Sequence, residues 1–188
     1  VVNISSPNTE GLRALQARQS LEALLGASME ARARSAPNPD KQPPLLVKVA
    51  PDLDLGEMQD IADVVIASGI DGLIIGNTTI DRPAGLKSDE KSQAGGLSGR
   101  PLMEKSTDCL AGFYRLTEGK IPLIGCGGVS SGADAYAKIR AGASLVQVYT
   151  ALVFHGPPLV GRIKRELTAL LKADGYKNVA AAVGADLR

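Results

Sequence analysis

The chain has 188 residues, of which 44% are hydrophobic and 22% charged, as is ordinary for a globular domain. A net charge of +1 and an aromatic content of 3% argue against a nucleic-acid or membrane-surface partner, which would need a basic face or stacking side chains. No apolar run approaches the roughly 20 residues of a transmembrane helix, and the two cysteines, Cys109 and Cys126, lack metal-ligand spacing, so no metal site is expected.

The first nine residues predict a strand that ends in a polar loop. Val1–Ile4 is a short apolar run rich in β-branched residues, which indicates a buried strand. Pro7 disfavours a helical conformation at Ser6, so Ser5 to Thr9 should form a stiff loop. Its polar side chains either cap the next helix or belong to a binding site. Because the chain begins inside a core strand without an initiator Met, we expect it to be the C-terminal portion of a longer protein.

A lysine in the next strand is the second informative feature. Leucines at helical spacing predict an amphipathic helix from Leu12 to Met29, ended before Pro37. The strand Leu45–Val49 follows, and it contains Lys48, although buried parallel strands are normally apolar throughout. We expect the ammonium group to face an anionic partner at the strand end, with a salt bridge to Asp52 as the alternative.

A third strand leads to a long polar loop. A helix ending at Gly69 precedes the strand Gly72–Gly76, and Asn77–Thr79 follows it. Between Asp81 and Arg100 the chain is polar and lacks periodicity, which is typical of a lid or a binding loop. The glycines of Gly95–Gly99 suggest that backbone approaches a ligand there.

The rest of the chain continues the alternation and adds a glycine-rich turn. We predict a helix from Pro101 to Leu116 and a strand over Ile121–Gly125. A short helix follows, with Ser131 and Asp134 at capping-box spacing and a stop at Gly142. A strand over Ser144–Val148 and a last helix over Leu159–Leu171 complete the chain. Gly127 and Gly128 precede the capped helix, where their N–H groups would form an anion site. Tyr149 and Thr150 would add donors. A plain strand-to-helix turn is the alternative.

Five strand–helix units in a row predict a parallel sheet with right-handed crossovers. The glycine loop follows the penultimate strand and a polar pair follows the last one, which is where (β/α)8 barrels bind phosphate. A Rossmann fold would instead carry G-x-G-x-x-G after its first strand. We therefore predict an α/β fold, a TIM barrel, of which residues 1–188 form a single partial domain with the last five units.

Polar residues gather at two of the predicted strand ends, those of the first and the third strand. Asn3, Asn8, Asn77 and Thr78 offer matched donors and acceptors, which suit a planar heterocycle with carbonyl, N–H and carboxylate groups. Taken singly, each is more often a turn residue. The only histidine, His155, is expected to be a solvated loop residue and not a catalyst.

At these positions the chain resembles the dihydroorotate dehydrogenases of the quinone-dependent, membrane-associated class. The motifs that carry the resemblance are Val2–Thr9, Val47–Asp52, Asn77–Thr79, Gly95–Gly99, Gly125–Gly132 and Gly142–Thr150. It implies an FMN enzyme of pyrimidine biosynthesis that oxidises dihydroorotate to orotate and reduces ubiquinone. It also implies a place at the mitochondrial inner membrane, or at the cytoplasmic membrane face in a bacterium, through an N-terminal segment outside this chain.

The resemblance assigns roles to single residues. Ser6 matches the base that removes the C5 proton, a position at which the soluble class has Cys. The residues matching pyrimidine contacts are Asn3, Asn8, Asn77 and Thr78, and those matching flavin contacts are Asn3, Lys48, Gly76, Gly99, Gly128, Tyr149 and Thr150, with Gly127 beside them. Gly76 departs from the expected Thr. Because a serine hydroxyl titrates far above neutral pH, Ser6 must pass on its own proton, and we hypothesise that Thr9 belongs to that relay.

Two other interpretations remain open from the sequence. One is a different FMN- or phosphate-binding barrel oxidoreductase. A hydroxy-acid oxidase would need an active-site histidine at a strand end, and a dihydrouridine synthase would need a basic RNA-binding surface. The other is a non-catalytic barrel fragment that cannot hold FMN alone, because the family's N-terminal strands supply further contacts.

Overall fold

The computed structural model describes residues 1–188 and contains one five-stranded parallel sheet. The strands are β1 (Val2–Asn3), β2 (Leu46–Val49), β3 (Gly72–Ile75), β4 (Leu123–Cys126) and β5 (Ala143–Gln147). Their order in the sheet is their order in the chain, β1-β2-β3-β4-β5. In a doubly wound sheet the order in which strands are added reverses at a switch point, whereas in a barrel each new strand lies beside the one before it. The sheet therefore has the predicted TIM-barrel arrangement, with five strand–helix units.

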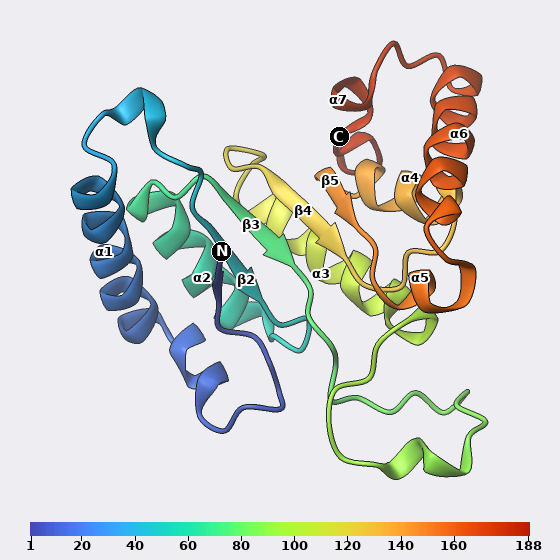
Figure 1. Cartoon of the computed structure of the whole chain (residues 1–188), viewed down its shortest axis with the longest axis horizontal. Helices are drawn as coiled ribbons and strands as arrows, with labels where there is room; N and C mark the ends of the chain where they lie inside the picture. The colour runs from blue at the N-terminus through green and yellow to red at the C-terminus, as the bar shows by residue number, and fades with distance from the viewer.

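Seven helices accompany this sheet, and the longer ones pack on one of its faces (Figure 1). The seven are α1 (Arg18–Ser35), α2 (Leu55–Ser68), α3 (Met103–Leu116), α4 (Gly132–Arg140), α5 (Thr150–His155), α6 (Pro158–Ala173) and α7 (Val179–Ala182). Val47, Leu73 and Leu123 point to the helices and are fully buried. On the opposite face Leu145 is 64% exposed. None of the helices combines the length and the apolar character needed to cross a bilayer.

Two predicted helix ends are confirmed. Ser131 caps α4, and its Oγ accepts a hydrogen bond from the amide of Asp134 at 3.1 Å. The Asp134 carboxylate bonds back to Ser130 and not to Ser131, so the capping box is only half formed. Gly69 ends α2 in the left-handed conformation, with φ of 68°.

The predicted first helix is wrong as a single element. A 3-10 helix, η1 (Leu12–Gln16), is separated from α1 by Ala17, whose backbone is extended. Gln16 is buried, and its side-chain oxygen accepts a hydrogen bond from the amide of Ala50 at 2.8 Å. This tertiary contact gives Gln16 a buried partner on the chain after β2, which the leucine spacing does not reveal.

Other element boundaries also differ from prediction. β1 contains two residues instead of a buried run, because it lies at the sheet edge; Val1 is 68% exposed and Asn3 is exposed, while Ile4 is buried. α3 begins at Met103, after a 3-10 turn η4 (Arg100–Leu102) that contains Pro101. The short helices α5 and α7 were not predicted.

The polar segment from residue 81 to residue 99 is irregular apart from the 3-10 turn η3 (Asp89–Ser92), as predicted. It extends away from the sheet at the bottom of Figure 1. A bridge between Thr79 and Leu97 closes its base. The Arg82 guanidinium donates to the carbonyls of Gln93 and Gly95, each at 2.7 Å. The Arg82 side chain and the backbone bridge thus hold the loop together.

Candidate active site

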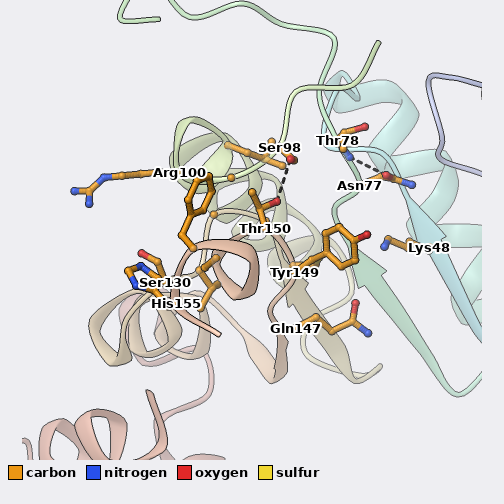
Figure 2. Close-up of a pocket in the computed structure, with 18 residues that line it drawn as sticks. Lys48, Asn77, Thr78, Ser98, Arg100, Ser130, Gln147, Tyr149, Thr150 and His155 are labelled. Atoms are coloured by element: carbon orange, nitrogen blue, oxygen red, sulfur yellow. Dashed lines mark hydrogen bonds between the residues drawn. The ribbon is translucent and has the colours of Figure 1, made fainter. Parts of the chain in front are cut away.

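A cavity of about 440 Å³ opens at the C-terminal ends of the strands (Figure 2). Loops after β3, β4 and β5 line it, together with Lys48 on β2. It brings together most of the residues predicted to bind substrate or cofactor, namely Lys48, Asn77, Thr78, Gly99, Gly127, Gly128, Tyr149 and Thr150. The convergence follows from the fold, because parallel strands end at one edge of the sheet.

Gly127 and Gly128, directly after β4, form part of the cavity wall. Both have positive φ angles, of 105° and 78°. Neither of their N–H groups donates to an acceptor within the chain. A Cβ atom on Gly128 would lie 2.5 Å from Cα of Met103, so no larger residue fits there without movement. Free N–H groups beside the start of α4 suit an anion such as a phosphate.

The end of the long loop contacts the turn after β5. Thr150 Oγ1 donates to Ser98 Oγ at 2.9 Å. Gly99 has φ of 83°, and a Cβ atom on it would lie 3.2 Å from the Thr150 methyl carbon. Tyr149 is 81% exposed. Ser98 and Gly99 are thus the part of the cavity wall that the long loop contributes, and Tyr149 and Thr150 come from the turn after β5.

Lys48 is half-buried and lines the cavity. It makes no ion pair within the chain. Asp52, the alternative partner, instead pairs with Arg13 at 2.9 Å and with Lys105 at 3.1 Å. The alternative of a Lys48–Asp52 salt bridge is therefore wrong, and the ammonium group of Lys48 is available to an anionic ligand.

Ser5 joins the loop after β1 to the loop after β3. Its side chain is fully buried, and its Oγ donates to Asn3 Oδ1 at 2.8 Å. Asn77 Nδ2 in turn donates to Ser5 Oγ at 3.0 Å. Ser6 follows directly and is half-buried, and its Oγ accepts a hydrogen bond from the amide of Asn8 at 3.3 Å. Ser6 thus lies at the same edge of the sheet as Asn77.

The base of the long loop covers Thr78. The amide of Gly96 donates to Asn8 Oδ1 at 3.1 Å, and a Cβ atom on Gly96 would lie 1.8 Å from Thr78 Oγ1. Thr78 Oγ1 is buried and has no hydrogen-bond partner in the chain. An unpaired buried hydroxyl costs free energy, so a polar ligand in the cavity would stabilise this side chain.

Some predicted site residues lie outside the cavity. Asn3, Ser6, Asn8 and Thr9 belong to the neighbouring β1 segment, and Thr9 makes no side-chain hydrogen bond to Ser6. Gly76 is buried with φ of 136°, and a Cβ atom on it would lie 2.9 Å from the carbonyl oxygen of Cys126. The close backbone accounts for a glycine at this position.

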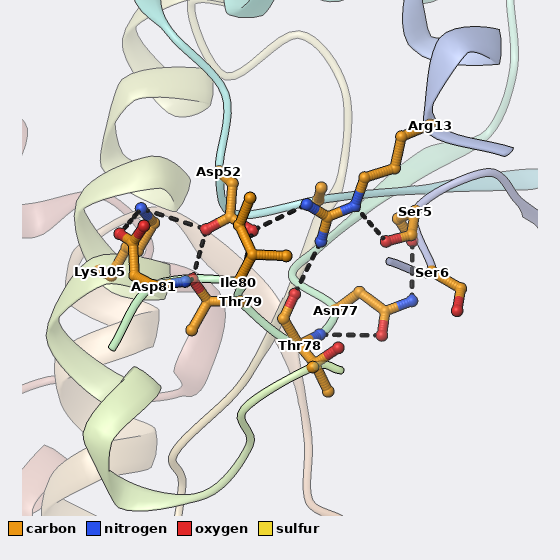
Figure 3. Close-up of polar contacts among 12 residues, drawn as sticks. Ser5, Ser6, Arg13, Asp52, Asn77, Thr78, Thr79, Ile80, Asp81 and Lys105 are labelled. Carbon is orange, nitrogen blue, oxygen red and sulfur yellow. Dashed lines mark hydrogen bonds and ion pairs between the residues drawn. The ribbon is translucent and has the colours of Figure 1, made fainter. Parts of the chain in front are cut away.

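Arg13 connects three strand-end loops and was not predicted from the sequence (Figure 3). Its Nε donates to the carbonyl of Ser5 at 3.1 Å, and its Nη2 donates to the carbonyl of Thr78 at 3.0 Å. Its Nη1 donates to Asp52 Oδ2 at 2.9 Å. Arg13 therefore fixes the backbone next to Ser6 and the backbone of Thr78 relative to each other.

The Asp52 carboxylate is the anionic centre of this cluster. Burial alone would raise its pKa, but hydrogen bonds from the Thr79 hydroxyl, the Ile80 amide, Arg13 and Lys105 outweigh burial and hold the pKa below its usual 3.8. Asp52 is thus an anion at neutral pH. The only sequence signal for this role is its place directly after a strand.

His155 lies in a different setting from the one predicted. It is the last residue of α5, and with Phe154 it lines the cavity. The prediction of a loop position is wrong, although the side chain is exposed as expected. A helix end is not the strand end at which a hydroxy-acid oxidase would carry its histidine.

Comparisons with known proteins agree with this geometry. The family model for dihydroorotate dehydrogenase matches residues 1–171. A dihydroorotate dehydrogenase (quinone) from Azorhizobium caulinodans is 61% identical over the whole chain, which covers 53% of that relative. The mitochondrial dihydroorotate dehydrogenase (quinone) of Mus musculus is 55% identical over the whole chain and is covered to 47%.

A solved structure gives the same picture. The crystal structure of DHODH from Eimeria tenella in complex with ferulenol superposes with a TM-score of 0.94 at 44% identity, covering 99% of this chain and 53% of that one. The chain spans about half the length of the curated relatives it matches. Because the family model matches nearly all of its residues, the chain belongs to the dihydroorotate dehydrogenase family.

Proposed function

We propose that the protein containing this chain oxidises dihydroorotate to orotate with FMN as the hydride acceptor and ubiquinone as the final electron acceptor, in pyrimidine biosynthesis. The names of the relatives support the reaction. The observation that carries the proposal is one cavity holding two free glycine amides, an unpaired lysine and an unpaired buried hydroxyl next to the Ser6 loop.

The donor set of the cavity fits FMN. The free amides of Gly127 and Gly128, with the hydroxyl of Thr150, suit its phosphate group. Lys48 carries a positive charge that suits the flavin ring system, which becomes negative on reduction. When bound, FMN supplies a two-electron acceptor for hydride.

Ser6 and the neighbouring polar side chains would handle the substrate. We propose that Asn3, Asn8, Asn77 and Thr78 hold the pyrimidine ring. Ser6 takes the C5 proton while the C6 hydrogen leaves with its electron pair, which creates the C5–C6 double bond of orotate. Ser6 can accept this proton only as its own hydroxyl proton leaves, through Thr9 or a water molecule. Ubiquinone then receives the two electrons.

The place in the cell is a further part of the proposal. Curated relatives from rice, Arabidopsis thaliana and mouse are named mitochondrial. We propose the mitochondrial inner membrane as the location if the source is a eukaryote, and the cytoplasmic membrane face otherwise, with attachment through a segment outside these 188 residues.

Rapid mixing of the flavin-loaded protein with dihydroorotate tests the role of Ser6. The variant Ser6→Ala should slow flavin reduction by roughly 10²–10⁴-fold, because it removes the general base. Ser20→Ala is the matched control, since Ser20 is exposed on α1 and should leave the rate unchanged. Reduction of Ser6→Ala at the normal rate would show that Ser6 is not the base.

FMN retention tests the cofactor separately. The purified natural protein should show a flavin absorbance band that dihydroorotate bleaches and a quinone restores. A colourless polypeptide of these 188 residues alone would instead favour a barrel fragment that cannot hold FMN by itself. Bleaching by a 2-hydroxy acid but not by dihydroorotate would favour a different flavin-dependent barrel enzyme.

A further inference from the structure

Lys138 is a buried cation without an anionic partner. It lies on α4, it is 0% exposed, and it forms no ion pair. Its Nζ donates to Ser106 Oγ at 2.8 Å and to Thr107 Oγ1 at 3.0 Å, both on α3. Buried lysines are rare and normally face a carboxylate. Burial lowers the pKa of Lys138 to about 8. Two neutral hydroxyls alone do not account for a lysine at this position.

Ser106 connects Lys138 to the glycine turn of the cavity. Its side chain is fully buried, and its Oγ donates to the carbonyl oxygen of Gly127 at 3.2 Å, sharing its proton with the carbonyl of Met103. Thr107 donates only to Met103, at 2.7 Å. A chain of donors therefore runs from Lys138 through Ser106 to Gly127, and Thr107 lies beside that chain without reaching the turn.

This chain of donors determines which way one peptide group faces. The polypeptide has no cis peptide bonds, so the carbonyl of Gly127 and the N–H of Gly128, which belong to one peptide group, point in opposite directions. Because the carbonyl points inward to Ser106, the N–H of Gly128 points to the cavity that both glycines line. A Cβ atom on Gly127 would lie 2.9 Å from Ser106 Oγ, so the close approach depends on glycine. Donation by an ammonium group also polarises the hydrogen bonds that follow it.

We propose that Lys138 and Ser106 are positioning residues for the phosphate group of the cofactor. They hold the Gly127–Gly128 peptide with its N–H toward the cavity and add positive charge behind it. The inference depends on the proposed function, because it takes the anion in the cavity to be the FMN phosphate. It makes the pair a determinant of selectivity for the phosphorylated ligand over the same ligand without phosphate.

Comparison of FMN with riboflavin tests this role, since the two differ only in the phosphate. Dissociation constants of both flavins are measured by fluorescence titration of the cofactor-free natural protein at full length. Lys138→Met and Ser106→Ala should each lower the preference for FMN over riboflavin about tenfold, a loss of about 1.4 kcal/mol. Affinity for riboflavin should change little.

Thr107→Val is the matched control. It removes the other hydroxyl that holds Lys138 but leaves the link to Gly127 intact, so its preference for FMN should stay within about twofold of wild type. If Lys138→Met does not fold by circular dichroism, Ser106→Ala decides the matter. An unchanged preference in both variants overturns the inference and leaves the proposed function standing. A wild-type protein that binds neither flavin overturns the proposed function, and the inference with it.

Discussion

Single residues can be predicted when they break a local pattern. Lys48 stands out because it interrupts an apolar strand, and the structure leaves it unpaired in the cavity. Arg13 has no such contrast, since arginine is ordinary on the polar side of an amphipathic segment. Its three contacts join residues up to 65 positions apart. The motif resemblance separates Ser6 from Ser5, but only the fold shows that the Ser5 hydroxyl is buried and that Ser6 is half-buried.

Removing the carboxylate of Asp52 should destabilise the protein. Asp52→Asn leaves Arg13 and Lys105 without their shared anion, at a site where the Asp52 side chain is only 8% exposed. We expect the free energy of unfolding in urea at pH 7 to fall by about 3 kcal/mol, the low end for a buried pair, because Arg13 and Lys105 are partly exposed. Asp60→Asn is the matched control, because it breaks an ion pair with Arg18 in which both side chains are 48% exposed. The control should cost less than about 1 kcal/mol.

The same variant should reveal the pH dependence of this ion pair. The pKa of Asp52 is lowered in the folded protein, so the unfolded chain binds a proton first as the pH falls. The contribution of Asp52 is therefore complete above pH 3.8 and is lost as the pH falls through the folded-state pKa. The stability difference between wild type and Asp52→Asn should stay constant from pH 7 to pH 5 and shrink below pH 4. A difference that does not change with acidification would contradict this account.

At the scale of elements, the sequence predicts the five strands and the longer helices better than it predicts their ends. The break between η1 and α1 at Ala17 accompanies a tertiary contact of Gln16, and the spacing of the leucines gives no sign of that contact. The start of α3 is displaced by a 3-10 turn. The helix α5 was overlooked because it has only six residues and is followed by Gly156 and Pro157. By contrast, Ser131 and Gly69 were predicted correctly, because a cap depends on residues adjacent in sequence.

The turn between β4 and α4 should tolerate no side chain at Gly128. Its φ of 78° is unfavourable for other residues, and a Cβ atom would also lie 2.5 Å from the backbone of Met103. Gly128→Ala should cost about 3 kcal/mol in urea unfolding and abolish flavin binding, because the backbone of one of the two segments must move.

Gly175 provides a control with the same backbone angle. Its φ is also 78°, but a Cβ atom there would meet nothing within 4 Å. Gly175→Ala should therefore cost only about 1–2 kcal/mol, the penalty of the left-handed conformation, and leave flavin binding intact. Equal costs for the two variants would mean that the contact with Met103 is easily relieved.

At the scale of the whole molecule, the meeting of distant loops was predictable. Parallel strands end at one edge, so the residues after β3, β4 and β5 had to converge. No local sequence pattern indicates which side chains pair with one another across that edge. The seating of the long loop on Asn8 and Thr78, and the ion pairs of Arg13 and Lys105, depend on backbone positions set by the whole fold.

The face of the sheet opposite the helices gives the last prediction. Parallel sheets normally have both faces covered, yet here Leu145 on β5 is 64% exposed. A polypeptide of these 188 residues expressed alone should therefore self-associate through this face, as measured by sedimentation velocity and by binding of a hydrophobic dye. Leu145→Lys should weaken association about tenfold, because it removes one buried leucine and adds charge repulsion between copies. Leu55→Lys is the control, since Leu55 is 80% exposed at the start of α2 in the helical layer. If Leu55→Lys weakens association as much as Leu145→Lys does, the copies associate through some surface other than this face.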